Sequence, residues 1–268
     1  DLYPARKRHF VWIFRILLRM KTSPSHFFAV SLSQLPSNFP HPSQAFATLS
    51  GLPVCRYALG GAARSSQPSS LPSKYYNALK GREDESSVFP NGAPFYFYYD
   101  PHRYPAFMSG VQELCENEST RTNLFVASGG TARSSFDIEQ RLQDALDKCG
   151  GDYLDLFILE YVSPYELEGN VASSELRSAI NQANEWKDEG RIRYVGASTH
   201  SHCVGAVLAN DEGIDTVMLR YSMAHKDAAD HISFPACVRN RKSVLAFCTT
   251  RWNSLQNGHV EWNEDSPT

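Results

Sequence analysis

The stretch "DYLDLFILEYVSPYE", residues 152–166, decides how the rest of the chain is interpreted. The run from Tyr153 to Leu159 is apolar apart from Asp155, and such a continuous apolar run is typical of a strand buried on both faces. A carboxylate, Glu160, follows at the point where the strand leaves the core. On this stretch alone, Glu160 is either a strand-end carboxylate that reaches water or part of a functional site.

Similar apolar runs recur along the chain and alternate with helical patterns. Seven strands are expected, at 54–61, 94–100, 123–130, 153–160, 191–199, 214–222 and 243–250. Helices are expected at 135–151, 173–190, 202–210 and 228–241, where apolar residues recur at helical spacing. Strands that alternate with helices in this way build a parallel sheet, which is either closed into a barrel or open and covered on both faces.

The barrel is the preferred interpretation. No G-x-G-x-x-G motif opens a helix after the first strand, which disfavours a dinucleotide-binding open sheet. We therefore expect an α/β fold, a (β/α)8 TIM-type barrel with seven strands present and the eighth strand unit missing from this chain. Because such barrels carry their chemistry at the carboxyl ends of the strands, Glu160 is expected at the rim of an active-site mouth.

The first 50 residues differ in composition from the rest. No acidic residue stands between Asp1 and Glu83, whereas that stretch carries eleven Lys and Arg. Residues 1–50 are also rich in Ser and Pro, which is typical of an organelle transit peptide that starts near Met20, and equally of a disordered tail or a gene-model artefact. A helix lying on a membrane surface is a third alternative. We expect this leader to pack little against an incomplete barrel domain at 51–268.

Composition excludes several classes of function. The net charge of -3 gives no reason to expect nucleic acid as a partner. The apolar run at 8–20 is shorter than the roughly 20 residues that cross a bilayer, so no membrane span is expected. Six scattered Cys form no C-x-x-C pair, and no metal site is expected. The expected location is the cytoplasm, or a plastid or mitochondrion if the leader directs import; the oligomeric state stays open.

Two motifs carry a resemblance to a known family. They are "ALDKCGGDYLDLFILEYVSP" (145–164) and "NEWKDEGRIRYVGASTH" (184–200), separated as in the aldo-keto reductases. The family pattern is a helix, then "L-x-x-D-Y-L-D-L", then "L-x-x-x-G-K-I-R-x-x-G-x-S". The chain resembles this family of (β/α)8 barrels from about Leu52 to its end. The resemblance implies an NADP-dependent oxidoreductase that reduces a small aldehyde or ketone with NADPH.

The family's catalytic Asp and Tyr fall on the segment "DPHRY". The resemblance implies that these residues are Asp100 and Tyr104, with a spacing of four where the family has five. Tyr98 or Tyr99 is an alternative partner for Asp100. In the family, the Tyr hydroxyl protonates the carbonyl oxygen, and a Lys that is oriented by the Asp lowers the pKa of the Tyr.

The other two catalytic positions of the family depart from its pattern. The Lys that ends the third strand falls on Gly129, and the His that ends the fourth falls on Glu160. One steroid-reducing branch of the family also carries Glu there, and a protonated carboxyl can donate a hydrogen bond to a carbonyl. Arg220 either replaces the lost Lys as a positive neighbour or is an ordinary solvated or salt-bridged Arg. Exchanging Gly129 for Lys is expected to raise activity unless other side chains fill the pocket.

The cofactor positions also follow from the resemblance. Ser198 and Thr199 match the family's Ser-Asn pair that holds the nicotinamide carboxamide, and Phe247 matches the aromatic residue that stacks on the nicotinamide. Gly60 and Gly61 would flank the pyrophosphate. These departures leave two functions open: an atypical, weak reductase, or a catalytically silent cofactor-binding or regulatory module on the same barrel, comparable to the potassium-channel β subunits.

Overall fold

Seven parallel strands alternate with helices in this chain. The structure is a computed structural model that describes residues 27–30, 46–60, 68–81, 87–98, 104–149, 151–222 and 226–249. The strands pair in the order β2-β3-β4-β5-β8-β9-β10, and every neighbouring pair is parallel. Their bounds are β2 Val54–Gly60, β3 Ala93–Tyr98, β4 Phe125–Gly130, β5 Leu154–Leu159, β8 Ile192–Thr199, β9 Thr216–Arg220 and β10 Ser243–Phe247. The predicted barrel order is confirmed.

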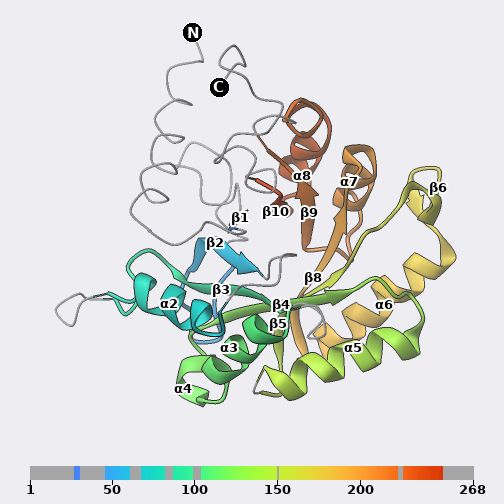
Figure 1. Cartoon of the computed structure of the whole chain (residues 1–268). Coiled ribbons are helices and arrows are strands. Elements are labelled where there is room, and N and C mark those ends of the chain that lie inside the picture. The colour runs from blue at the N-terminus through green and yellow to red at the C-terminus, as the bar shows by residue number, and fades with distance from the viewer. Residues whose placement is uncertain are drawn as a thin grey trace, which may run out of the picture.

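The helices cover the outer, convex side of this curved sheet (Figure 1). They are α2 Ser70–Leu79, α3 Pro105–Cys115, α4 Glu118–Arg121, α5 Ser135–Lys148, α6 Ser174–Asp188, α7 His202–Ala209, η4 Ala229–Ser233 and α8 Phe234–Arg239. Between β5 and α6 lie a short helix, η2 (Pro164–Glu166), and the hairpin of β6 (Leu167–Glu168) and β7 (Val171–Ala172). Buried aromatic contacts fix the outer layer, since Phe157 of β5 packs edge-on against Trp186 of α6 at 5.2 Å between ring centroids.

A further strand from the leader closes the sheet. β1 (Phe27–Val30) pairs antiparallel with both β2 and β10. The side chain of Phe46 is 3% exposed and packs inside the barrel, and Arg193 donates a hydrogen bond of 2.7 Å to the carbonyl oxygen of Ala47. The prediction that residues 1–50 pack little is therefore wrong for 27–30 and 46–50. The physical reason is that a seven-stranded sheet leaves two edges with unpaired backbone groups, which β1 satisfies. A role of the leader in import stays a prediction.

Side chains fill the barrel interior below its mouth. Alternate residues of each strand point inward, as in other small barrels. The inward cluster consists of Phe46, Val54, Ala58, Phe95, Phe97, Phe125, Ala127, Leu156, Ile158, Met218 and Leu245. A Cβ added at Gly196 would lie 2.8 Å from Thr216 Cγ2 and 3.0 Å from Ile158 Cγ1, so the interior has no room even for a methyl group there. The carboxyl ends of the strands therefore lie above a closely packed barrel interior.

Asp155, the polar residue within the apolar strand, serves the fold. Its fully buried carboxylate accepts hydrogen bonds from Arg121 Nη1 at 2.9 Å, Arg193 Nη1 at 2.8 Å and the backbone N–H of Val126 at 2.9 Å. Two guanidinium groups and one amide therefore compensate the cost of burying this charge. Asp155 lies near the amino end of β5, away from the strand ends that carry chemistry.

Candidate active site

Five residues mark the inward-facing positions at the carboxyl ends of five neighbouring strands. They are Gly129 of β4, Glu160 directly after β5, Ser198 of β8, Arg220 of β9 and Phe247 of β10. Their inward direction follows from the strand alternation, because each is two residues from another inward position or packs on the interior cluster. This end of the barrel is called the mouth below.

The backbone around Glu160 is held on both sides. Its N–H donates to the carbonyl oxygen of Gly130 at 2.8 Å, and its own carbonyl oxygen accepts from Arg133 Nη2 at 2.8 Å. Arg133 Nε in turn donates to Glu166 Oε1 at 2.6 Å, so a partly buried ion pair fixes the loop that follows β5. The half-buried Glu160 carboxyl lies toward β4, since a Cβ added at Gly129 would be 3.0 Å from Glu160 Oε1.

Gly129 has a steric reason to be glycine. A Cβ at this position would lie 2.3 Å from the carbonyl oxygen of Ile158, a distance that no real Cβ contact shows. The family's Lys therefore does not fit here without a backbone shift between β4 and β5. A cation does contact the segment, because Arg141 of α5 donates from Nε to the Gly129 carbonyl oxygen at 2.9 Å and from Nη2 to Ser128 Oγ at 2.8 Å. That contact is on the outer side of β4, facing the helices.

The side chains of Ser198 and Thr199 point to opposite sides of the sheet, although the two residues are adjacent in the sequence. Ser198 Oγ accepts a hydrogen bond of 2.9 Å from the backbone N–H of Tyr161, which ties β8 to the loop after β5. Thr199 points the other way, and a Cβ at Gly205 of α7 would lie 3.6 Å from its methyl group. The Thr199 hydroxyl accepts from the N–H of Ser201 at 3.1 Å. Neighbours in a strand face opposite sides, so Thr199 lies in the outer layer and not at the mouth.

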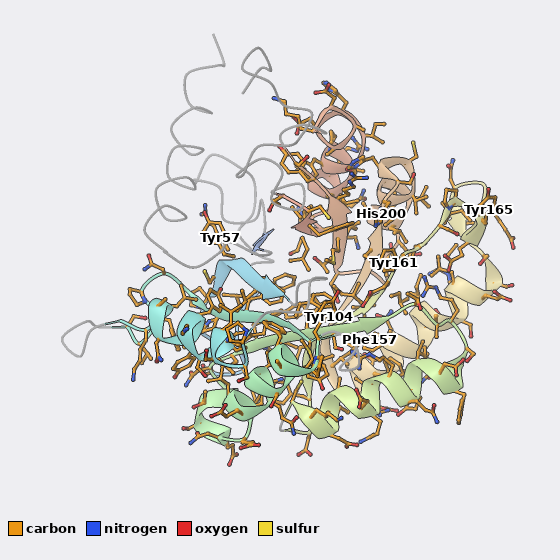
Figure 2. All side chains as sticks on the ribbon, viewed as in Figure 1. Tyr57, Tyr104, Phe157, Tyr161, Tyr165 and His200 are labelled. Carbon is orange, nitrogen blue, oxygen red and sulfur yellow. The ribbon has the colours of Figure 1, made fainter. Side chains whose placement is uncertain are left out.

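Tyr104 occupies the residue before α3 (Figure 2). Its ring is half-buried and packs against the core between the strands and the helices, while the interior cluster lies on the other side of the sheet. Tyr98 is fully buried in that same outer core, and burial raises its pKa, so it is no partner for the mouth. Gly60 ends β2 and is buried. Three further sequence-predicted positions lie outside the described residues: Tyr99, Asp100 and Gly61.

An aromatic cluster at the mouth joins Phe247, which the resemblance assigned to the site, with two rings that it did not assign, Tyr161 and His200. The ring of His200 lies 5.4 Å from that of Tyr161 and 5.1 Å from that of Phe247, measured between centroids, and Figure 2 shows Tyr161 and His200 side by side. Tyr161 adopts a left-handed backbone conformation with φ of 57°, which is uncommon for a residue with a side chain. Partial burial, and then the charge of Arg220, lower the pKa of His200. The only sequence signal for Tyr161 and His200 is that each lies within two residues of a strand end.

Two further properties bear on the class of site. Among the described residues, no group of three or more His, Cys, Asp or Glu side chains is placed to hold a metal ion. The described helices include none that is both long enough and apolar enough to span a membrane.

Solved structures similar to this chain are aldo-keto reductases. An aldo/keto reductase from Klebsiella pneumoniae in complex with NADP and acetate is 16% identical with a TM-score of 0.58, and the match covers 80% of this chain and 71% of that one. The holo form of an aldo-keto reductase from Bacillus halodurans is 21% identical with a TM-score of 0.44, covering 55% of this chain and 48% of that one. An aldose reductase from Giardia lamblia is 14% identical with a TM-score of 0.47, covering 69% and 63%.

The chain thus spans about half to two thirds of the length of the latter two enzymes. No curated protein matches it. The sequence model of the aldo/keto reductase family matches residues 111–260, which is more than half of the 268 residues and includes every strand end from β4 to β10. The first of the three structures independently supports the same barrel fold. The chain therefore belongs to the aldo/keto reductase family.

Proposed function

We propose that this protein is an atypical oxidoreductase that reduces an aldehyde or ketone with NADPH at the mouth of its barrel. The observation that carries the proposal is the position of Glu160, whose backbone is held on both sides and whose carboxyl lies beside Gly129 at a strand end. In a barrel of this family, a carboxyl group held in place at a strand end favours a role in carbonyl chemistry over a structural role.

The residues at the mouth fit the nicotinamide end of the cofactor in part. Phe247 offers a half-buried ring at the end of β10, and Ser198 still has a hydroxyl proton to donate, because its oxygen serves as acceptor for Tyr161 N–H. Thr199 does not fit, because it faces α7. When bound, NADPH supplies a hydride to the carbonyl carbon of the substrate. With only one aromatic face and one hydroxyl group to bind it, the nicotinamide end of the cofactor should be bound with low affinity.

Glu160 is proposed to hold the proton that the carbonyl oxygen needs. In its protonated form, a carboxyl group donates a hydrogen bond to that oxygen and so stabilises the negative charge that develops on it. Tyr104 and Asp100 are retained as a proposed second acid and its partner. Because Gly129 supplies no ammonium group, we expect turnover well below that of reductases with the full set of catalytic residues, since general acid catalysis contributes about 10²- to 10⁴-fold.

A silent cofactor-binding or regulatory module is the second candidate. It is favoured by the close approach of the Ile158 carbonyl oxygen to Gly129, which excludes Lys at that position, and by the packing of Tyr104 against the outer core. Both observations describe a barrel whose usual catalytic positions are no longer available to side chains. The two candidates differ in turnover and agree in cofactor binding.

The test combines NADPH binding with turnover by the full-length protein. We expect NADPH fluorescence to show binding, and a panel of aldehydes and ketones to show slow NADPH oxidation that Glu160→Gln lowers by about tenfold or more. Glu168→Gln is the matched control, because Glu168 is an exposed carboxylate on the β6–β7 hairpin. Binding without turnover would favour the silent module. Absence of both binding and turnover would exclude both candidates.

A further inference from the structure

Arg220 differs from two other arginines of the barrel, because no described carboxylate pairs with it. Arg133 pairs with Glu166, and Arg141 pairs with Asp144. Arg220 is half-exposed, and within the part of the chain that the structure describes it forms no salt bridge. A guanidinium that is partly withdrawn from water and has no carboxylate partner among the described residues can bind an anionic ligand.

His200 lies next to this cation. The charge of Arg220 acts on the His200 ring, and the ring itself lies between those of Tyr161 and Phe247. Strand pairing places Arg220 opposite Phe247, so Arg220 and the three rings all lie at the ends of the neighbouring strands β5, β8, β9 and β10. The left-handed backbone of Tyr161 is part of this arrangement and costs conformational energy, which is a common feature of ligand sites.

We propose that Arg220 and His200 form an anion-binding subsite that selects carbonyl substrates with a carboxylate next to a planar ring. The inference rests on the proposed function, because it assigns the substrate of the same mouth. A guanidinium binds a carboxylate with two parallel hydrogen bonds, and the rings of Tyr161 and Phe247 supply flat apolar faces for the rest of the molecule. A phosphate of the dinucleotide shares this anionic chemistry, and the experiment below separates the two sources.

The proposal includes a dependence of binding on pH. The charge of Arg220 from β9 acts on the His200 ring, and the ring of Tyr161 after β5 lies 5.4 Å from it. Glu160 after β5 and Cys248 after β10 are the other titratable groups at the ends of these neighbouring strands. In the absence of ligand, burial and Arg220 disfavour the protonated imidazole. A bound carboxylate favours the protonated form, so binding takes up a proton. The affinity for carboxylates should therefore rise as the pH falls toward the pKa of free His200, which lies below its ordinary value of about 6.5, and level off below that pKa.

The experiment compares 4-carboxybenzaldehyde with its methyl ester, which has the same ring and aldehyde without the charge. We expect the full chain to prefer the carboxylate in kcat/KM by about tenfold or more, and Arg220→Met to bring that ratio close to one, because a hydrogen-bonded ion pair is worth that factor. His200→Phe keeps an aromatic ring and should remove the pH dependence of the ratio. Arg239→Met removes the same charge from an exposed site on α8 and should leave the ratio unchanged.

Three outcomes would overturn the proposal. The first is an equal kcat/KM for acid and ester in the unmodified protein, and the second is a preference that survives Arg220→Met. The third is a weaker NADPH affinity of Arg220→Met with an unchanged substrate ratio, which would assign Arg220 to the dinucleotide phosphate. If neither compound is turned over, the proposed function fails. The anion-binding subsite is then tested by itself, by measuring benzoate binding to the unmodified protein and to Arg220→Met with calorimetry. Binding that Arg220→Met weakens about tenfold supports the site, and binding that it leaves unchanged overturns it.

Discussion

Adding a single methyl group at Gly129 should destabilise the barrel and leave its chemistry unrepaired. In Gly129→Ala the new Cβ would lie 2.3 Å from the Ile158 carbonyl oxygen and 3.0 Å from Glu160 Oε1, whereas ordinary contacts begin at 3.4 Å. The strands β4 and β5 would have to separate by about 1 Å, and overpacking of this kind costs typically 1–3 kcal/mol. Because the closest atom is backbone, we expect about 2–3 kcal/mol, or a fall in Tm of about 4–12 °C.

Chemical denaturation monitored by circular dichroism measures this change, and Gly130→Ala is the control next to it in the chain. A Cβ at Gly130 would lie 3.3 Å from Arg141 Cγ, an atom of a long side chain that can move, so we expect a loss below about 1 kcal/mol. The resemblance to the family suggested that Gly129→Lys raises activity; the steric argument predicts a destabilised protein with no gain. Equal stability of Gly129→Ala and the unmodified protein, or higher turnover of Gly129→Lys, would refute the reasoning.

Three more substitutions test other parts of the structure. Asp155→Asn leaves the buried Arg121 without its full counter-charge, and we expect a loss of about 3–5 kcal/mol in urea denaturation, with a loss below 1 kcal/mol contradicting the network. Phe46→Ala should cost about 3–5 kcal/mol if this leader residue fills the barrel interior, and a neutral result would remove it from the core. Arg133→Met should misplace Glu160, so we expect kcat to fall by up to about 100-fold with a changed pH profile of kcat and a smaller effect on KM. An unaltered pH profile of kcat would show that Arg133 has only a structural role.

The strands could be predicted because burial on both faces produces a signal that needs no tertiary information. The run from Tyr153 to Leu159 is such a case, and β5 lies at Leu154–Leu159. Helix α5 was predictable for a related reason, since its apolar stripe is regular. Helix α2 was not, because it has no side-chain cap and carries Pro72 within its first turn. The pairing of β1 could not be predicted either, because a four-residue strand becomes stable only against edges that the folded sheet provides.

The site was only partly accessible to sequence reasoning. A motif match places Ser198 and Thr199 together, but the period of two in a strand sends one hydroxyl to the mouth and the other to α7. His200 and Arg220 are separated in the sequence by a helix, and their proximity arises only from the pairing of β8 with β9. Sequence patterns report which residues share a strand, whereas the parallel ladder decides which strand ends meet.

Gly129 and Glu160 stand where the family pattern has Lys and His, and the two substitutions are best explained together. The β4–β5 ladder pairs Gly129 with Ile158, two residues before Glu160, and the carboxyl of Glu160 reaches to within 3.0 Å of the place that a Cβ of residue 129 would occupy. A Lys side chain starting from that position would collide with the backbone of β5 before its ammonium group could meet the carboxylate. The pair therefore exchanges a cation that acts on a tyrosine for a carboxyl that can act directly on the substrate. On that basis, the catalytic proton of this barrel should come from Glu160, so turnover should fall as the pH rises and the donor loses its proton, and that fall should disappear in Glu160→Gln but persist in Tyr104→Phe.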